Sequence, residues 1–233
     1  SDSQRGWVVG LGGTVRRTIN GGETWVPYQV SVQQPFYHVS FVSPTSGWMV
    51  GGGGVILHTT DGGEHWSEQA SGTRATLYAA HFLNEQHGVV VGALGTILTT
   101  DDGGSTWVAR STQGAVTFFD VFLIDHANGW AVGNAGALFQ TSDGGVHWKD
   151  LSLPCGKACT KLVDLMKIRF TSAQDGWIIG DHGALYRTTD GGFTWTQEPA
   201  IAPVSLFGLS FFGAKQGWAT GAKGTIVYMQ LIQ

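Results

Sequence analysis

Residues 59–66 read TTDGGEHW and contain residue types that acid–base chemistry uses. Asp61 lies in a glycine-rich stretch, and Trp66 follows as an aromatic platform. A carboxylate placed in this way can act as a general acid or base. The same residues also suit a tight turn, because Asp accepts backbone hydrogen bonds and Gly adopts positive φ. The number of copies of the stretch decides between the two interpretations.

The stretch recurs as TINGGETW, TTDGGEHW, TDDGGSTW, TSDGGVHW and TTDGGFTW, which end at residues 25, 66, 107, 148 and 195. Five equivalent copies cannot all form one active site. We therefore expect the motif to hold turns, with its tryptophans packing between neighbouring units. The residues concerned are Asn20, Asp61, Asp102, Asp143 and Asp190, with Trp25, Trp66, Trp107, Trp148 and Trp195.

A glycine that opens a short apolar run marks each unit of the repeat. These glycines are Gly6, Gly47, Gly88, Gly129, Gly176 and Gly217, and the steps between them are 41, 41, 41, 47 and 41 residues. Each unit contains four short strands, here named A to D, separated by glycine-rich turns and without a helical period. A repeat of this length with four strands per unit predicts an all-β propeller.

The repeat predicts one propeller domain over residues 1–233. The first unit lacks strand A and the last lacks strand D, so we expect six blades with incomplete ends. Seven blades would need about 287 residues and therefore further sequence. Unpaired terminal strands invite strand exchange between copies. The predicted units are 1–35, 36–76, 77–117, 118–164, 165–205 and 206–233.

The T-x-D-x-G-x-x-W motif resembles the Asp box of BNR-type propellers. The longer unit GWAVGNAGALFQTSDGGVHW at residues 129–148 resembles the photosystem II stability and assembly factor family. The resemblance covers nearly the whole chain. It implies a non-enzymatic chaperone or scaffold that binds a subunit of a membrane complex. It also implies an extracytoplasmic location, in the periplasm or the thylakoid lumen.

Composition restricts the other function classes. The net charge is −4, which argues against nucleic acid as the partner. No apolar run is long enough for a transmembrane helix. The start, SDSQRGW, has neither an initiator Met nor a signal-peptide pattern, as is typical of a processed N-terminus. We expect no cofactor and no metal.

The two cysteines, Cys155 and Cys159, lie in the six-residue insertion that lengthens one step of the repeat. A local disulfide, two free thiols and, less favourably, a zinc site are all compatible with this spacing. A disulfide would indicate an oxidising compartment.

Function is expected where the repeats differ. In strand A, whose copies begin FYHVSFV and FFDVFLI, the second, fourth and sixth residues are apolar while the third and fifth vary. The variable face is expected to line the central channel, either as a plug of paired charges or as a ligand site. Its candidate residues are His38, His81, Asp120, Lys167 and Arg169.

Two further sets of side chains depart from the repeat. Asp181 and His182 lie in the B–C turn of the fifth unit, on the face that carries the long D–A crossovers, and form either a solvated turn or part of a site. Arg16, Arg17 and Arg187 on strand C are either exposed charges or a docking place for an acidic partner.

Two classes of function remain. A protein-binding or peptide-binding propeller agrees with the whole-chain resemblance and with the lack of a nucleophile–base pattern. A carbohydrate-binding, sialidase-like or glycoside-hydrolase-like propeller is the alternative. A sialidase-like site needs several arginines at the axis, and only Arg169 falls in an inner column. A hydrolase needs two carboxyl groups across a cleft, for which Asp120 and Asp181 are the candidates.

Overall fold

The computed structural model describes residues 4–110, 112, 116–152, 163–213 and 216–230. Cys155 and Cys159 lie outside these ranges, so their bonding stays a prediction. The described chain forms six antiparallel sheets, the blades of an all-β propeller, joined by turns. No helix in the described ranges has the length and apolar character needed to cross a bilayer.

The chain divides into two compact units, residues 1–117 with 145–147 and residues 118–144 with 148–233. Each holds three blades, and each is described by itself. The assignment of the whole chain to a single domain stays a prediction.

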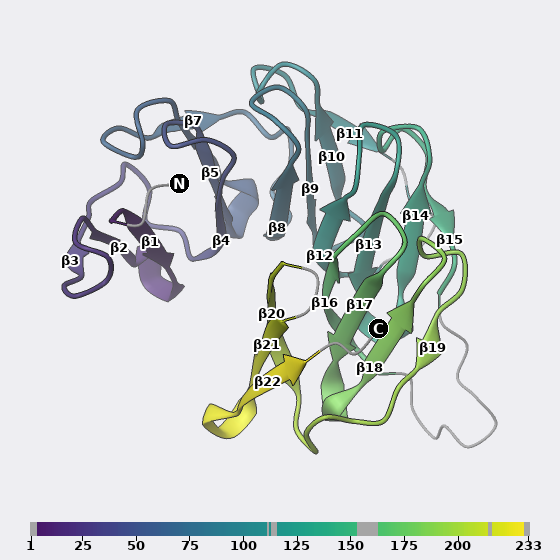
Figure 1. The fold of residues 1–233 in the computed structure, drawn as a ribbon. Coiled ribbons are helices and arrows are strands. Elements are labelled where there is room, and N and C mark those ends of the chain that lie inside the picture. Colours follow the sequence, from purple (N-terminus) through teal and green to yellow (C-terminus); the bar gives the residue numbers. More distant parts are fainter. Residues whose placement is uncertain (1–3, 111, 113–115, 153–162, 214–215, 231–233) are drawn as a thin grey trace. The chain divides into compact units, whose positions relative to one another are not determined.

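Unit 1 contains blades 1 to 3, drawn purple to teal in Figure 1. Blade 1 has three strands and blades 2 and 3 have four, in sequence order across each sheet. The strands are β1 (Gly6–Val9), β2 (Val15–Thr18) and β3 (Val26–Pro27); β4 (Phe36–Phe41), β5 (Gly47–Gly51), β6 (Ile56–Thr59) and β7 (Ser67–Gln69); β8 (Leu77–Phe82), β9 (Gly88–Gly92), β10 (Ile97–Thr100) and β11 (Val108–Arg110).

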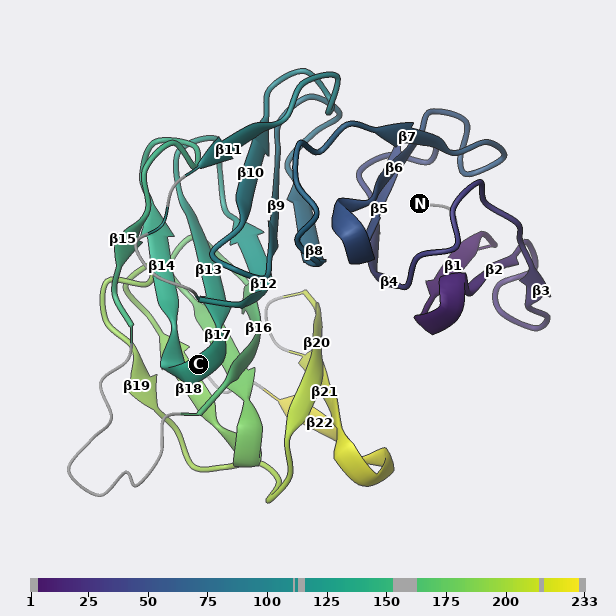
Figure 2. The ribbon, with the colours of Figure 1, turned by 180° about the vertical axis from the view of Figure 1, so that it is seen from behind.

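Unit 2 contains blades 4 to 6, teal to yellow, which Figure 2 shows from behind. Blades 4 and 5 have four strands and blade 6 has three. The strands are β12 (Phe118–Leu123), β13 (Gly129–Gly133), β14 (Leu138–Thr141) and β15 (Lys149–Asp150); β16 (Leu165–Phe170), β17 (Gly176–Gly180), β18 (Leu185–Thr188) and β19 (Thr196–Gln197); β20 (Leu206–Phe212), β21 (Gln216–Gly221) and β22 (Ile226–Gln230).

The incomplete terminal blades agree with the sequence. β1 corresponds to strand B and β22 to strand C, so within residues 4–230 blade 1 has no strand A and blade 6 no strand D. In five blades the B–C connection is a single 3-10 turn: η1 (Leu11–Gly13), η2 (Gly52–Gly54), η3 (Asn134–Gly136), η4 (Asp181–Gly183) and η5 (Ala222–Gly224). In blade 3 an ordinary turn joins β9 to β10.

Backbone hydrogen bonds place the turns at the two ends of each blade as expected. In blade 2, the Asp-box amide of Gly62 donates to Thr45 O in the A–B turn, at 2.8 Å. At the other end, the Gly52 amide in the B–C turn donates to Pro35 O in the crossover, also at 2.8 Å. The long crossovers therefore share an end of the blade with the B–C turns.

A β-bulge interrupts strand A in every blade that has one. In β4, Phe36 pairs with Gly51 and His38 pairs with Val50, so Tyr37 has no opposite residue. The same shift occurs in β8, β12, β16 and β20. A bulge breaks the alternation of faces along a strand. We number the residues of strand A from its first residue. Because of the bulge, the residues at positions 3 and 5 lie opposite strand-B residues that pack on the next blade.

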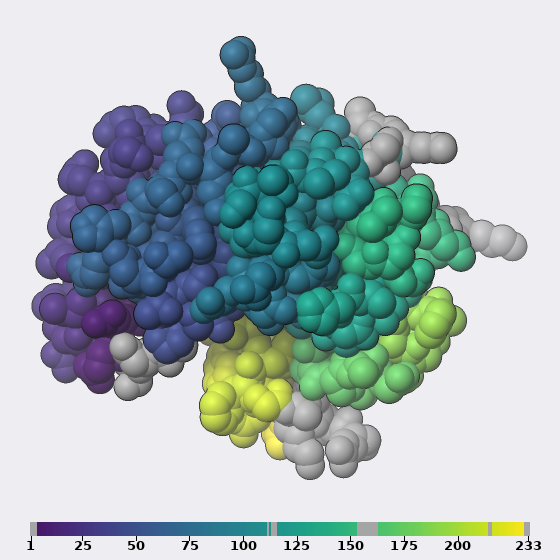
Figure 3. Space-filling model, turned by 90° about the horizontal axis from the view of Figure 1, so that it is seen from above, coloured from purple at the N-terminus to yellow at the C-terminus, as the bar shows by residue number. Residues whose placement is uncertain are grey.

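Neighbouring blades are joined by aromatic side chains. Trp48 of blade 2 stacks on Phe82 of blade 3 with ring centroids 3.6 Å apart, and Trp130 of blade 4 lies 4.6 Å from Phe170 of blade 5 with the rings tilted by 35°. Strand B of blades 2 to 5 is buried along its whole length. The space-filling view shows the side chains of blades 2 and 3 meeting in a continuous surface (Figure 3).

An Asp-box glycine allows the tryptophan of the preceding blade to approach closely. A Cβ added to Gly63 would lie 2.2 Å from Cζ2 of Trp7, and one added to Gly192 would lie 2.5 Å from Nε1 of Trp130. Gly63 also has a φ of 90°, in the left-handed region that favours glycine. The second Asp-box glycine is therefore required for two independent reasons.

We predict that Gly63→Ala destabilises the protein more than Gly72→Ala does. Gly72 has a φ of 72° with open space around it, so its substitution should cost only the backbone strain, about 1–2 kcal/mol. Gly63→Ala adds the clash with Trp7, about 1–3 kcal/mol more. Urea unfolding of both variants measures the difference, and equal losses would contradict the packing described.

Candidate partner-binding site

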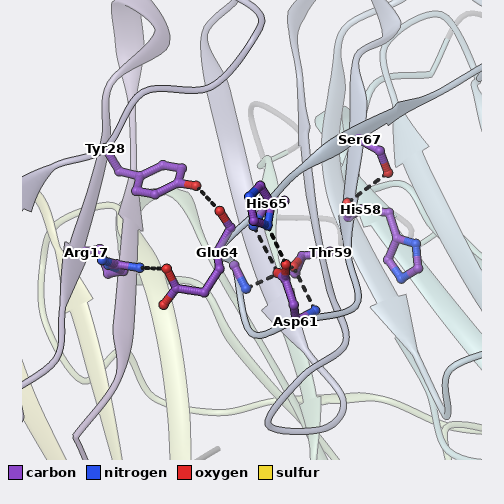
Figure 4. A network of polar contacts seen from close by, with 9 residues as sticks. Arg17, Tyr28, His58, Thr59, Asp61, Glu64, His65 and Ser67 are labelled. Atoms are coloured by element: carbon purple, nitrogen blue, oxygen red, sulfur yellow. Dashed lines mark hydrogen bonds and ion pairs between the residues drawn. The ribbon is translucent and has the colours of Figure 1, made fainter.

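The Asp-box side chains are used within their own turns (Figure 4). Asp61 Oδ1 accepts hydrogen bonds from the Thr59 hydroxyl at 2.8 Å and from the His65 amide at 2.9 Å. Its Oδ2 lies 2.8 Å from His65 Nδ1. Gly63 N donates to the Thr59 hydroxyl at 2.9 Å, which closes the turn. Blades 3 and 5 repeat these contacts around Asp102 and Asp190, and Asn20 serves as the acceptor in blade 1.

These hydrogen bonds stabilise the ionised carboxylates. The backbone N–H of His65 is the main cause that holds the pKa of Asp61 well below its ordinary value. The hydroxyl of Thr194 is the main cause for Asp190 and lowers its pKa to about 2. General-base catalysis works best when the pKa of the base lies near the working pH. The Asp-box acids therefore suit turn formation better than proton transfer at neutral pH.

The Asp-box tryptophans differ in their hydrogen bonding. Trp107 Nε1 donates to Gln69 Oε1 of the preceding blade at 3.2 Å. The indole N–H groups of Trp66 and Trp195 are buried without a partner among the described residues. Trp25 is 37% exposed, since blade 1 lacks the strand A whose ring would pack on it. In blades 2, 3 and 5 that ring lies edge-on to the tryptophan.

Strand C places a side chain on the strand-B tryptophan of the same blade. The cross-strand pairs are Trp7 with Arg17 and Trp177 with Arg187. The guanidinium carbons lie 5.8 Å and 5.0 Å from the ring centroids, within cation–π range. His58 takes the same place on Trp48, with the two ring centroids 4.4 Å apart. Burial lowers the pKa of His58, which favours its neutral imidazole.

Each of the three arginines considered for docking has a contact within the chain. Arg17 Nη1 lies 2.7 Å from Glu64 Oε2, and Tyr28 OH donates to Glu64 O at 2.6 Å (Figure 4). Burial raises the pKa of Tyr28, which agrees with its role as a donor. Arg187 lies 3.4 Å from Asp175. Arg16 is exposed and donates to Trp25 O at 3.4 Å. Their docking of an acidic partner stays a prediction.

Asp120 is the most buried charge of the candidate set, at 1% exposure. Its carboxylate accepts hydrogen bonds from Lys167 Nζ at 3.1 Å, from Ile168 N at 3.0 Å and from the Arg169 guanidinium. All three donors belong to β16 of the next blade. Unit 2 therefore brings Asp120, Lys167 and Arg169 together as a compensated cluster.

His38 makes the corresponding contact in unit 1. Its Nδ1 accepts a hydrogen bond at 3.3 Å from the backbone N of Ala80. Ala80 occupies position 4 of strand A, as does Ile168 in blade 5. In both units, a position-3 side chain thus accepts the position-4 N–H of the following blade. His81 lies at position 5 of β8 and is half-buried.

The bulge adds inter-blade contacts to the variable face of strand A. His38 and Asp120, at position 3, contact the next strand A. Whether this face lines the central channel stays a prediction. The more exposed residue is at position 2, where Tyr37 is 42% and Phe207 is 48% exposed. Tyr37 and Tyr78 lie with ring centroids 5.0 Å apart. The sequence contains a signal of the bulge. Every strand A begins with two consecutive large apolar residues, which strict alternation of buried and exposed residues does not allow.

The B–C turns carry Asp181 and His182 at the crossover end of blade 5. The Asp181 amide donates to Asp164 O at 2.9 Å, so the turn is tied to the crossover. His182 is exposed, with a φ of 55°. Leu94, Ala135 and Lys223 adopt the same left-handed conformation in their own turns. Blades 3 to 6 thus each present one side chain at this end, whereas blades 1 and 2 have Gly12 and Gly53 in the same place.

No group of three potential metal ligands gathers among the described residues. The candidate residues fall in two places, the compensated strand-A contacts and the crossover ends of the blades. Their role in binding a partner stays a prediction.

Comparison with known proteins identifies a family. A model described as "Photosynthesis system II assembly factor YCF48" matches residues 1–71, 65–154, 111–199 and 154–230. No curated protein matches the chain.

Solved structures share the fold. A structure of YCF48 bound to D1 peptide has 24% identity and a TM-score of 0.53, covering 99% of this chain and 89% of that one. YCF48 from Cyanidioschyzon merolae has 22% identity and a TM-score of 0.62, with coverages of 99% and 93%. A GH74 xyloglucanase from Xanthomonas campestris has 14% identity and a TM-score of 0.73, with coverages of 95% and 41%.

We predict that Asp190→Asn flattens the pH dependence of stability in acid. The folded pKa of Asp190, about 2, lies below its ordinary value of 3.8, so its stabilising contribution is present above the ordinary value. That contribution is lost as the pH falls from about 5 towards 2. Asn keeps the acceptor, as Asn20 does in blade 1. Urea unfolding at several pH values measures the slope, and identical slopes would show that the carboxylate is not stabilised by folding.

We also predict that Asp120→Ala destabilises the protein by about 3–5 kcal/mol, because Lys167 and Arg169 keep their charges without the carboxylate. The double variant Asp120→Ala/Arg169→Met should recover part of this loss. Thermal and urea unfolding measure both. A loss below about 1 kcal/mol in the single variant would mean that the cluster is solvated instead of compensated.

Proposed function

The chain belongs to the family of the photosynthesis system II assembly factor YCF48, and from this we propose that it is a non-enzymatic propeller that binds a protein or peptide of a membrane complex. The observation that carries the proposal is the family match, which extends over residues 1–230. The structure of a relative with a bound D1 peptide supports a peptide as the ligand class.

The site geometry supports binding more than catalysis. The Asp-box carboxylates are used by their turns, and Asp120, one of the two candidate catalytic acids, is paired with Lys167 and Arg169 of β16. The similarity to a xyloglucanase is a similarity of fold, at 14% identity. Carbohydrate binding or hydrolysis is therefore the weaker proposal.

We assign the protein to an extracytoplasmic compartment, the periplasm or the thylakoid lumen, as an accompanying proposal. It acts there as a scaffold or assembly chaperone for a membrane-complex subunit. Exchange of terminal strands between copies stays a prediction.

Cross-linking followed by affinity purification from the source cells tests this function. The tagged chain should enrich a membrane-complex subunit over a tag-only control, because a chaperone contacts its client directly. A glycan panel provides the opposing arm. Enrichment of no protein, together with turnover of β-glucans or sialosides that Asp120→Asn abolishes, would overturn the proposal in favour of an enzyme.

A further inference from the structure

A polar groove of about 350 Å³ lies at the crossover end of blade 2. Gly53 and Gly54 of the B–C turn line one side, and residues 68–74, the end of β7 and the crossover to β8, line the other. Blades 1 and 3, which flank blade 2, belong to the same unit. In a propeller a blade packs on its two neighbours, so no further blade covers this end of blade 2.

Two side chains of opposite charge line the groove without a partner in the chain. Glu68 and Arg74 are both exposed, and neither side chain has a hydrogen bond or an ion pair to another described residue. Gln69 differs, because its amide donates to Gly103 O at 2.8 Å and accepts from Trp107 Nε1 at 3.2 Å. The groove therefore offers one anionic and one cationic group to a ligand.

The groove is open because Gly53 carries no side chain. Blades 3 to 6 have a side chain in the same place, at Leu94, Ala135, His182 and Lys223. Their φ angles lie between 52° and 58°, so this turn accepts residues other than glycine. A Cβ added to Gly53 would meet only the side chain of Gln34, at 3.8 Å, which is an ordinary contact. Packing within the chain therefore does not require glycine here.

Small residues form both walls of the groove. On one wall, Gly54 is required by the fold, since a Cβ there would lie 2.1 Å from Thr73 O. On the other wall, residues 70–72 read Ala-Ser-Gly, and Gly72 is exposed with open space around it. Walls of this kind let the main chain of a ligand come close to the backbone. They suit a polypeptide segment, which carries hydrogen-bonding groups along its whole main chain.

We propose that this groove binds a polar segment of the partner protein, with a basic side chain beside Glu68 and an acidic side chain beside Arg74. A segment that carries both signs complements both groups, whereas a ligand of one sign meets a like charge at one of them. Loops that join strands are also where binding residues concentrate. The proposal names the docking place and the charge pattern of the partner, and so rests on the proposed function.

Photo-cross-linking of the tagged full chain in the source cells locates the contact. Benzoylphenylalanine replaces Ala70, an exposed residue of the groove, or Gln29, the equivalent exposed residue in the crossover of blade 1. The partner should be linked from position 70 and not from position 29. Mass spectrometry of the adduct identifies the linked segment, which should contain a basic and an acidic residue close to the linked one. A segment without both charges would overturn the proposal.

Gly53→Leu tests the open groove, with the linked segment as a labelled synthetic peptide. Leucine fills the place as Leu94 does in blade 3, so fluorescence anisotropy should show binding weakened by about tenfold or more. The matched control is Gly12→Leu, because Gly12 takes the same place in blade 1 with a φ of 64° and open space around it. Binding to this control should stay within about twofold of the parent. Both changes add similar backbone strain, so the two thermal unfolding midpoints should agree. Equal peptide binding by the two variants would contradict the assigned place.

Charge reversal tests the two ion pairs. Glu68→Lys and Arg74→Glu should each weaken peptide binding by about tenfold or more, because a like charge then faces the ligand. The double variant should prefer a peptide whose basic and acidic residues are exchanged over the original peptide. Glu23→Lys makes the same change of charge at the exposed Asp box of blade 1 and should leave binding within about twofold. An equal loss in Glu23→Lys and Glu68→Lys would mean that net charge alone matters, and the groove would no longer be the site.

Two further results separate this inference from the proposed function. If the tagged chain enriches a membrane-complex subunit that is linked only from positions outside the groove, the docking place is overturned and the function stands. If the linked segment shows the predicted response to the variants but belongs to a protein outside any membrane complex, the docking place stands and the function is overturned. Enrichment of no protein at all would overturn both.

Discussion

The structure depends on the contact between the strand-B tryptophan of one blade and the next blade. The ring stacks on the sixth residue of the following strand A, as in Trp48 on Phe82, at 3.6 Å. Its edge approaches the second Asp-box glycine, as Trp130 approaches Gly192. In blades 2 and 5 this contact explains why a glycine is required opposite the tryptophan, whereas Gly104 of blade 3 faces Gln69 instead. The Asp-box carboxylate holds its turn by accepting hydrogen bonds within it.

The polar contacts that differ between blades lie where the strands A of neighbouring blades meet. Position 3 of strand A accepts an N–H from the next blade, through a histidine in one unit and an aspartate in the other. A charge in this place needs compensation, which Lys167 and Arg169 provide.

The fold was predictable because its signals are local and repeated. Gly47, Asp61 and Trp66, with their copies, determine the number of blades, the strand order and the incomplete ends. The contacts of strand A with the next blade were not predictable, because one bulged residue changes the alternation, although Phe36 and Tyr37 in succession were a usable signal. The roles of Arg17 and Arg187 depend on their register against Trp7 and Trp177, which spacing alone does not fix.

The central claim is that the Asp-box turns maintain the fold while residues that differ between the repeats bind the partner. Amide hydrogen exchange of the full chain, alone and with its purified partner, tests this most directly. The account predicts that the partner protects amides in the strands A or at the crossover ends of the blades, with little change in the Asp-box turns. Protection confined to the Asp-box turns would contradict it.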